Sequence, residues 1–371
     1  PRCRRAGRDQ RHALIGLHGG RGAAGVRPGF ARTRIQPRTA GGTPAFPVHS
    51  RAMCGINAIF AYGSAAPPVD RDEVIATREC MLSRGPDAGD AWFSDDGRVG
   101  FGHRRLAIID LSPGGAQPKH FGSLTIIFNG EIYNYRELRA QLEESGRRFT
   151  SQSDTEVLLQ LYDEKQEAML GELRGMFTIA LWDGARRRML LARDPYGIKP
   201  LYYADDGATI RIASQVRALV AGGKVSTQFD SAGAAGFFLR GTVPEPFTMY
   251  RAIRALPAGS FLYVDANGVH EPVTYFSIAA TLRDAVERDE HFTDNQRREI
   301  VHDAVLESVR YHMVADVPVG AFLSAGIDST AVVALVREAG ATDLVTMMLR
   351  LEEYRGRDND AAPMGAREAR Q

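Results

Sequence analysis

Cysteine, tryptophan and net charge are all scarce in this sequence of 371 residues. It holds three cysteines and two tryptophans, and its formal net charge is +1. The cysteines form no CxxC pair and the nine histidines show no HxxxH spacing, so the common zinc motifs are excluded and we expect no metal site. So few cysteines also argue against a disulfide framework, which suits a reducing compartment such as the cytoplasm.

Long apolar runs and an excess of basic residues are missing as well. No run approaches the roughly 18 apolar residues that a membrane-spanning helix needs. Lysine plus arginine (46) and aspartate plus glutamate (45) nearly cancel, which argues against a dedicated nucleic-acid binder. The sequence therefore predicts no membrane and no nucleic-acid partner, and small molecules are the expected partners. The choice between a monomer and a homodimer stays open.

The first 52 residues differ from the rest in composition. They hold eleven arginines, no lysine and one acidic residue, Asp9, among many glycines, alanines and prolines. Such a composition without apolar periodicity is typical of disorder. The apolar stretch 13–17 is too short for a signal peptide, and an arginine-rich transit peptide stays an alternative. We expect residues 1–53 to be a disordered or non-native upstream extension, with Met53 as a natural start.

Residues 54–270 are expected to form one α+β domain, because short apolar alternations dominate and helical stretches are inserted between them. After the opening strand from Gly55, the expected strands are 90–94, 98–102, 106–110, 123–128, 176–182, 188–193, 201–204, 209–213 and 260–264. The expected helices are 70–82, 134–145 and 155–165.

A polar stretch at 271–294 is expected to be a linker. Residues 295–371 then predict a parallel α/β unit, with a helix at 295–314, a strand at 317–323, a helix at 328–339 and a strand at 343–351. A doubly wound sheet normally needs several such units, so we expect this second domain to be incomplete.

Cys54 follows Met53 directly, so removal of the methionine would make the cysteine the first residue. Its free α-amine, with a pKa near 7.7–8.0, can then act as a base toward its own thiol without a histidine. For this short motif alone, a small buried cysteine at the start of a strand is the alternative.

Five further motifs weigh against that alternative. They are Arg84-Gly85-Pro86-Asp87, Gly102-His103-Arg104-Arg105-Leu106, Asn129-Gly130-Glu131-Ile132-Tyr133-Asn134, Ser153-Asp154-Thr155-Glu156 and Gly175-Met176-Phe177. With Cys54 they resemble class II glutamine amidotransferases, the N-terminal-nucleophile type found in glutamine-dependent asparagine synthetases. The likeness extends to about Val264 and includes residues 193–202. It implies a four-layer αββα N-terminal nucleophile hydrolase fold and hydrolysis of glutamine at Cys54.

The resemblance also implies roles for residues around the nucleophile. Attack on a carboxamide creates an oxyanion, and its expected donors are the Asn129 side-chain amide and the Gly130 backbone N–H. The glutamine α-carboxylate is expected to bind Arg105, whose planar guanidinium suits it. The α-ammonium is expected to bind Asp154, with help from Glu131.

Arg84 is expected to support the glutamine pocket from a neighbouring turn. The other motifs have structural alternatives that stay open. Residues 129–130 could form a hairpin turn after the strand that ends at Phe128, and residues 153–156 could cap a helix. Arg105 could be a surface charge.

Residues 317–330 combine an apolar strand, a turn of small residues and a helix start. They resemble the pyrophosphate-binding loop of ATP pyrophosphatases, whose usual form is Ser-Gly-Gly-x-Asp-Ser, with Ala325 in place of the first glycine. A plain strand–helix connection, capped by Asp328 or Ser329, is the alternative. The resemblance implies sites for ATP and Mg²⁺ at Leu323, Ser324, Gly326, Asp328 and Ser329.

The leading hypothesis is a glutamine-dependent asparagine synthetase whose synthetase part is incomplete, with glutamine, ATP and aspartate as family substrates. Ala361 and residues 365–366 stand where that family has acidic residues. One alternative is a related ligase that amidates another carboxylate; an intact Cys54 disfavours a β-lactam synthetase, which needs no ammonia. Another alternative is an inactive remnant that only binds glutamine.

Overall fold

The computed structural model describes residues 53–288, 291–324, 326–342 and 344–348. They fall into two compact units that divide between Val319 and Gly320. The expectation for residues 1–52 and the departures at Ala361 and 365–366 lie outside the described residues.

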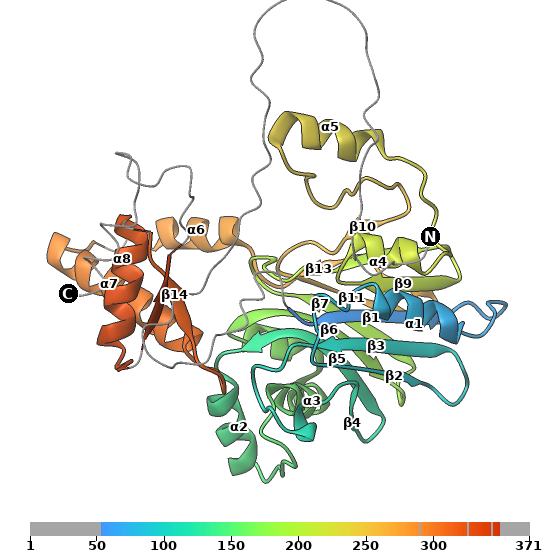
Figure 1. The fold of residues 1–371 in the computed structure, drawn as a ribbon, viewed down its shortest axis with the longest axis horizontal. Coiled ribbons are helices and arrows are strands. Elements are labelled where there is room, and N and C mark those ends of the chain that lie inside the picture. The colour runs from blue at the N-terminus through green and yellow to red at the C-terminus, as the bar shows by residue number, and fades with distance from the viewer. Residues whose placement is uncertain (1–52, 289–290, 325, 343, 349–371) are drawn as a thin grey trace, which may run out of the picture. The chain divides into compact units, whose positions relative to one another are not determined.

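Two antiparallel sheets form the centre of the first unit (Figure 1). The strands of one sheet are β1 (Gly55–Ala61), β2 (Ala88–Phe93), β3 (Val99–Arg105), β8 (Tyr202–Asp205), β9 (Thr209–Ala213) and β10 (Arg254–Ala255). The strands of the other are β4 (Lys119–Phe121), β5 (Leu124–Ile132), β6 (Gly175–Asp183), β7 (Arg188–Arg193), β11 (Ser260–Asp265), β12 (Gly268–Val269) and β13 (Val273–Thr274). The first sheet has the order β10-β8-β9-β1-β3-β2, and the second has β12-β11-β7-β6-β5-β4 with β13 on β11.

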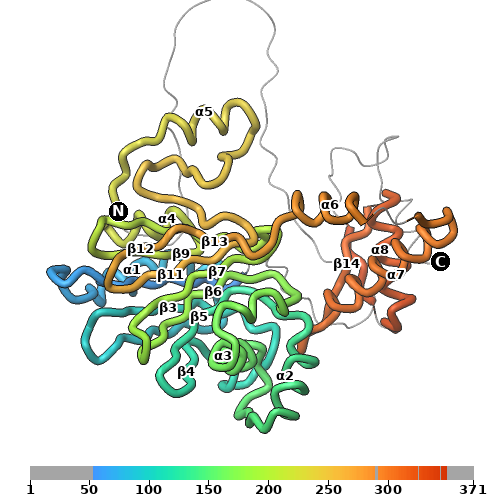
Figure 2. Tube along the Cα trace, turned by 180° about the vertical axis from the view of Figure 1, so that it is seen from behind, coloured from blue at the N-terminus to red at the C-terminus, as the bar shows by residue number. Residues whose placement is uncertain are grey.

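Helices cover the outer face of each sheet. The second sheet carries α2 (Tyr135–Glu144) and α3 (Asp154–Lys165), which lie side by side in both views (Figures 1 and 2). The first sheet carries α1 (Arg71–Glu79) and α4 (Val216–Ala221). Short 3-10 helices occur at Pro113–Gly115 and Gln166–Gly171.

Strand alternation in β5 shows how the sequence builds these layers. Ile127 packs in the apolar cluster between the two sheets, whereas Ile126 and Phe128 pack in the cluster beneath α2 and α3. Successive side chains of a strand point to opposite faces, so one strand serves two cores. A third cluster, with Met81 and Leu219, lies under α1 and α4. The predicted four-layer αββα fold is confirmed.

Two sequence-based interpretations of this unit are wrong, and part of its helical structure had not been expected. Residues 129–130 form no hairpin turn, because β5 continues through them to Ile132 and pairs with β6. Residues 106–110 form a loop, since Asp110 has a positive φ of 51° and the chain bends around the Arg105 side chain. Helix α5 (Ser231–Arg240) had not been expected at all.

The expected linker at 271–294 contains helix α6 (Ile278–Glu287). After it, α7 (Asp294–His312) begins with a capping box at Thr293 and contacts the β5–α2 region. Glu307 forms an ion pair with Arg174 (2.9 Å), and the His312 ring lies 4.5 Å from that of Tyr133. The first compact unit therefore runs beyond residue 270 to Val319. The assignment of catalytic domains to 54–270 and 295–371 stays a prediction.

The second unit contains β14 (Gly320–Phe322), α8 (Ile327–Glu338) and β15 (Val345–Met347). The two strands pair in parallel, so the expected strand–loop–helix–strand connection is present, with shorter strands than predicted. The Leu323 N–H extends the pairing by donating to the Met347 carbonyl at 2.9 Å.

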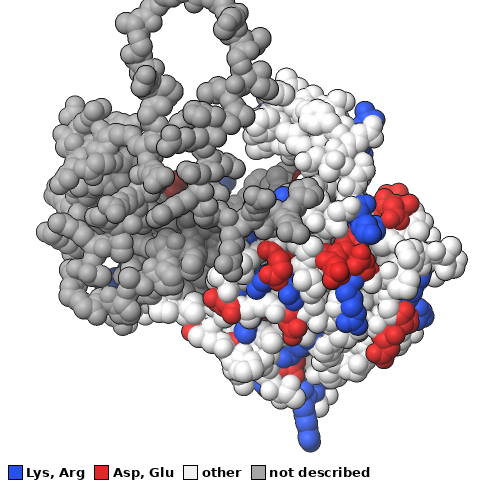
Figure 3. Space-filling model, turned by 45° about the vertical axis from the view of Figure 1, so that its right-hand side comes forward, with Lys and Arg blue, Asp and Glu red and all other residues white. Residues whose placement is uncertain are grey.

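Charged side chains of both signs are interspersed on the coloured part of the surface in Figure 3, with no broad area of one sign among the residues drawn. Among the residues that the structure describes, no helix has the length and apolarity to cross a bilayer.

Candidate active site

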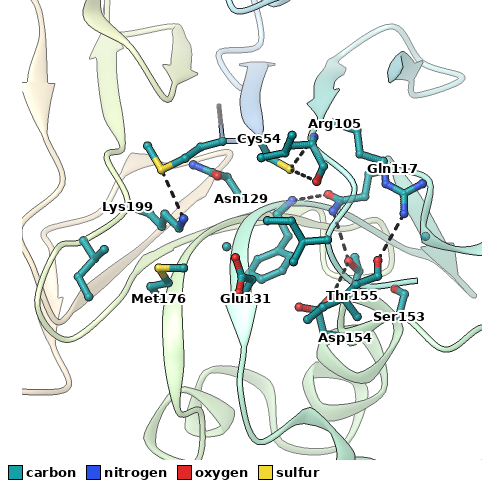
Figure 4. A pocket seen from close by; sticks show the side chains of 18 residues that line it. Cys54, Arg105, Gln117, Asn129, Glu131, Ser153, Asp154, Thr155, Met176 and Lys199 are labelled. Atoms are coloured by element: carbon teal, nitrogen blue, oxygen red, sulfur yellow. Dashed lines mark hydrogen bonds between the residues drawn. The ribbon is translucent and has the colours of Figure 1, made fainter. Parts of the chain in front are cut away.

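A cavity of about 320 Å³ opens beside Cys54 in the first unit (Figure 4). It lies where the ends of β1 and β3, the strand β5 and the start of α3 meet. The polar side chains along its wall are those of Cys54, Arg105, Gln117, Asn129, Glu131, Ser153, Asp154, Thr155 and Lys199. Four of the five sequence motifs thus meet Cys54 at one cavity, although they extend along the chain as far as Met176.

The Cys54 thiol faces this cavity and contacts the backbone of Leu106. The Leu106 N–H donates to Sγ at 3.3 Å, and the thiol donates to the Leu106 carbonyl at 3.5 Å. Burial raises the pKa of the thiol, while the Leu106 backbone and the charge of Lys199 lower it. An N–H aimed at sulfur favours the thiolate, the nucleophilic form of cysteine.

Arg84 lies behind the nucleophile and is not part of the cavity wall. Its Nε donates to the Cys54 carbonyl at 3.0 Å, and its own carbonyl accepts from the Met53 N–H at 2.8 Å. The side chain is 6% exposed, and its Nη2 has no hydrogen-bond partner among the described residues. This position suits a supporting role, since Arg84 fixes the backbone that carries the thiol.

The Arg105 guanidinium is held by backbone carbonyls at the cavity wall. It donates to the carbonyls of Ser112 (3.2 Å), Ile109 (3.4 Å) and Asp110. These bonds explain why the chain at 106–110 wraps around the side chain and does not continue as a strand. The held cation is a suitable partner for a carboxylate.

Asn129 and Gly130 lie inside β5, where pairing with β6 fixes their backbone. Asn129 is 1% exposed, and both atoms of its side-chain amide are buried without a hydrogen-bond partner among the described residues. Burying an amide whose nitrogen and oxygen both lack hydrogen bonds costs folding free energy, unless a bound ligand supplies a partner. At Gly130 a Cβ would stand 2.1 Å from the Met176 carbonyl oxygen, so only glycine fits.

Asp154 is the first residue of α3 and faces the cavity. The Ser153 hydroxyl caps the helix by accepting from the Glu156 N–H at 3.3 Å, which confirms the predicted helix start. Asp154 Oδ2 accepts from the Ile132 N–H at 3.2 Å. Burial, with a smaller contribution from the Glu131 charge, raises the pKa of Asp154 to about 7. A cationic group in the cavity would stabilise the charged carboxylate and so lower this pKa.

Glu131 supplies a second carboxylate to the wall. Burial raises its pKa, and the charges of Lys199 and His312 lower it. Together, Arg105 and Lys199 place positive charge, and Glu131 and Asp154 place negative charge, around one space. This arrangement matches a small ligand that carries both a carboxylate and an ammonium.

Sequence reasoning missed Gln117, which links strand β5 to helix α3. Its Oε1 accepts from the Phe128 N–H at 2.6 Å, and its Nε2 donates to the Thr155 hydroxyl at 3.3 Å. The Thr155 hydroxyl in turn donates to Asp154 Oδ1 at 3.5 Å. The His103 ring also bonds the Phe128 backbone. A single glutamine between Ala116 and Pro118 carries no periodic signal that could have revealed this link.

Lys199 was also missed as a site residue, although residues 193–202 had been recognised as part of the family likeness. Its side chain forms part of the cavity wall (Figure 4). It is 5% exposed, and Nζ lies 3.4 Å from Met53 Sδ. The motif Gly-Ile-Lys-Pro was the available signal, but its lysine could equally have been a solvated turn residue.

The expected nucleotide loop lies in the second unit. Ser324, Gly326 and Asp328 are exposed, whereas Leu323 is buried. The Ser329 hydroxyl lies 3.1 Å from that of Ser324 and accepts from the Ser324 N–H at 3.1 Å. The predicted cap at Asp328 or Ser329 is wrong, because Gly326 is the cap residue of α8 and no side chain caps it.

Metal-binding groups of three or more His, Cys, Asp or Glu side chains do not occur within the described residues. The open start of α8 can receive an anion such as a phosphate, since its first N–H groups lack a side-chain partner.

Two protein families match this chain over separate stretches. The glutamine amidotransferase domain matches residues 53–276. The asparagine synthase family matches residues 301–370.

Curated relatives match about three quarters of this chain. An asparagine synthetase [glutamine-hydrolyzing] 1 of Bacillus subtilis is 38% identical over 289 residues, which cover 77% of this chain and 44% of the relative. A putative asparagine synthetase [glutamine-hydrolyzing] of Mycobacterium bovis is 36% identical over 300 residues, covering 76% and 45%. The chain therefore spans less than half the length of these curated relatives.

Among solved structures, a glutamine phosphoribosylpyrophosphate amidotransferase from B. subtilis aligns with a TM-score of 0.46 at 17% identity, covering 80% of this chain and 82% of that one. The family match over 53–276 includes Cys54 and every residue that lines the cavity. The chain belongs to the glutamine amidotransferase domain family and is similar to the glutamine-hydrolysing asparagine synthetases.

Proposed function

We propose that the first unit hydrolyses the side-chain amide of glutamine at Cys54, yielding glutamate and ammonia. One observation carries the proposal: the Cys54 thiol shares a cavity with a buried Asn129 amide that has no partner among the described residues. A carbonyl oxygen that turns into an oxyanion during attack would supply the missing acceptor. The family match gives the substrate class, and the charged wall fits an amino acid.

The wall charges orient the substrate in this proposal. Arg105 receives the α-carboxylate, and Asp154 with Glu131 receives the α-ammonium. The amide end of glutamine then points toward Cys54 and the Asn129–Gly130 segment. Because the guanidinium and Asp154 are already held by backbone groups, little side-chain entropy is lost on binding.

The chemistry needs the α-amine of Cys54 to be free. That amine takes the thiol proton, the thiolate attacks the amide carbon, and Asn129 and Gly130 donate to the oxyanion. The tetrahedral intermediate collapses to a thioester as ammonia leaves with the returned proton. Water then attacks the thioester, releasing glutamate and restoring the thiol.

The proposed fate of the ammonia is amidation of an ATP-activated carboxylate, with aspartate as the acceptor, in a cytoplasmic protein. The support is the match of residues 301–370 to the asparagine synthase family. Ser324, Gly326, Asp328 and Ser329, with Leu323 beside the adenine, would hold ATP and Mg²⁺; bound ATP supplies the leaving group that activates the carboxylate. A homodimer is proposed for the assembly on family likeness alone.

Cys54→Ala tests the glutaminase proposal. The purified polypeptide that begins at Cys54 should release ammonia from glutamine, and the Cys54→Ala form should release none while keeping its melting temperature. Cys80→Ala is the control, because Cys80 is buried outside the cavity. A glutamine-mimicking electrophile should label Cys54. Measurable turnover by Cys54→Ala would contradict the assignment.

A further inference from the structure

Lys199 and Arg105 are the two cationic side chains that line the cavity. They are held differently. Arg105 is committed to a set of backbone carbonyls, whereas the described hydrogen-bond partner of the Lys199 ammonium is the thioether of Met53. A thioether is a weak acceptor and carries no charge. The ammonium therefore has bonding capacity left, and it lies beside the residue that precedes the nucleophile.

The backbone of Lys199 is fixed on both sides. Its N–H donates to Asp194 Oδ2 at 2.9 Å, and its carbonyl accepts from Arg193 Nε at 2.8 Å. Lysine is almost never this deeply buried unless its charge has a use or a partner, because desolvating an ammonium is costly. The fold thus keeps the positive charge of Lys199 at the cavity wall despite the cost of removing water from the ammonium.

We propose that Lys199 is the electrostatic partner of the Cys54 thiolate. This inference rests on the proposed hydrolysis at Cys54 and adds the cation that supports its nucleophile. Loss of Met53 removes the thioether, so the ammonium loses this partner next to the newly freed amine, and the Cys54 thiol lines the same cavity. Lys199 transfers no proton in this role; it supplies a fixed charge.

A fixed positive charge acts on both groups in the same direction. It favours the thiolate over the thiol, because unlike charges attract, and it favours the neutral amine over the ammonium, because like charges repel. Both effects raise the fraction of the reactive pair near neutral pH. Around Lys199 the other charged groups are Glu131, Asp194 and Arg84, and around Cys54 they are Asp154 and Arg105.

Lys199→Met tests the role, because methionine keeps the length of the side chain and removes its charge. The first readout is alkylation of Cys54 by iodoacetamide across pH, measured on the full chain by peptide mass spectrometry, which separates Cys54 from Cys3 and Cys80. We expect the apparent pKa of the thiol to rise by about one unit, so that alkylation near neutral pH slows roughly tenfold. Lys199→Arg, which keeps the charge, should stay within about threefold of the wild type.

Lys119→Met is the matched control. Lys119 is also a largely buried lysine, but it bonds the Gly114 carbonyl at 2.6 Å and does not line the cavity. Its loss should leave the Cys54 profile unchanged. If Lys199→Met does not fold, Lys199→Gln takes its place, with melting temperature as the check. An unchanged alkylation profile in the folded neutral variant would overturn the inference.

The second readout is the pH profile of kcat/KM for glutamine, measured on the polypeptide that begins at Cys54. Its acidic limb should move to higher pH in Lys199→Met and stay in place in Lys199→Arg. A wild-type polypeptide without glutaminase activity would overturn the proposed function while leaving the alkylation result to stand for Lys199. An active wild type with an unmoved limb in Lys199→Met would overturn only the role of Lys199.

Discussion

The cavity beside Cys54 and the loop at 323–329 both place small and polar residues where strands end and helices begin, yet they differ in what surrounds them. At the cavity, Asn129 is 1% exposed and its side-chain amide has no hydrogen-bond partner among the described residues. In the loop, Ser324 and Asp328 are exposed, and the Ser324 and Ser329 hydroxyls bond each other. Buried groups without partners point to a ligand, whereas exposed groups can be satisfied by water.

The cause of the difference is the number of layers. The cavity is lined by strands of both sheets and by the start of α3, and helices cover the outer face of each sheet, so the fold takes several of its polar groups out of water. The described part of the second unit has one pair of short strands and one helix. A two-stranded sheet cannot enclose a site on its own. Nucleotide binding at the loop is therefore supported by family likeness alone. Ligand binding in the cavity is supported by family likeness and by geometry.

The largest expected effect concerns the amine of Cys54. In the structure this nitrogen is part of the Met53–Cys54 peptide bond, so it has no lone pair to accept the thiol proton. We expect the 371-residue chain to be inactive until it is cleaved before Cys54, and the polypeptide that begins at Cys54 to be active. Intact-mass analysis paired with an ammonia assay would measure this. Equal activity from the uncleaved chain would contradict the requirement for a free α-amine on Cys54.

Asp154→Asn should give the next largest effect. Losing a charged hydrogen-bond partner costs about 1.5–3 kcal/mol, so KM for glutamine should rise roughly 10- to 100-fold. In the wild type, KM should also rise as the pH falls through about 7, because the carboxyl then becomes neutral. Steady-state kinetics across pH would measure both. A KM that stays flat with pH would argue against Asp154 as the ammonium site.

Asp154→Asn should weaken glutamine binding but should not lower the stability of the fold. Since the folded pKa of Asp154 is raised, its contribution to stability is present below its ordinary pKa and is lost as pH rises through about 7. The variant should therefore melt no lower than the wild type, and its relative gain should be greatest above pH 7. Thermal unfolding at acidic and alkaline pH would show this.

Gln117→Met should give a smaller effect that separates positioning from stability. The Phe128 N–H would lose its acceptor next to the oxyanion segment, and an unpaired buried N–H costs about 1–3 kcal/mol. We expect kcat to fall about tenfold with KM changed less. Gln160→Met is the control, because Gln160 is 1% exposed in α3 but does not line the cavity. Equal kcat losses in both variants would reduce the role of Gln117 to packing.

The smallest effect is expected from the loop. Ser324→Ala combined with Asp328→Asn should leave glutamine hydrolysis unchanged, since neither residue lines the cavity. Trimming after Val319 should preserve hydrolysis, because Asp316 still holds the 106–110 loop by accepting from the Asp110 N–H at 2.8 Å. Loss of glutamine hydrolysis in the double variant would overturn this contrast.

Local signals in the sequence determined much of the fold. Alternating apolar residues located most strands, and the motif order identified the family and predicted the nucleophile. Ser153 as a helix cap could be predicted because its bond reaches only to Glu156, three residues away. Such features depend on neighbours in the chain, which a sequence displays directly.

The tertiary structure decided what depends on distant partners. The Asn129–Gly130 pair has the composition of a turn, but pairing with Thr178 and Phe177 makes it part of a strand. Gln117 and Lys199 reach the cavity because strands and loops far apart in sequence meet there, and each residue alone reads as a surface side chain. Long-range backbone pairing outweighs local preference when it satisfies many hydrogen bonds at once, and a sequence does not display which segments will pair.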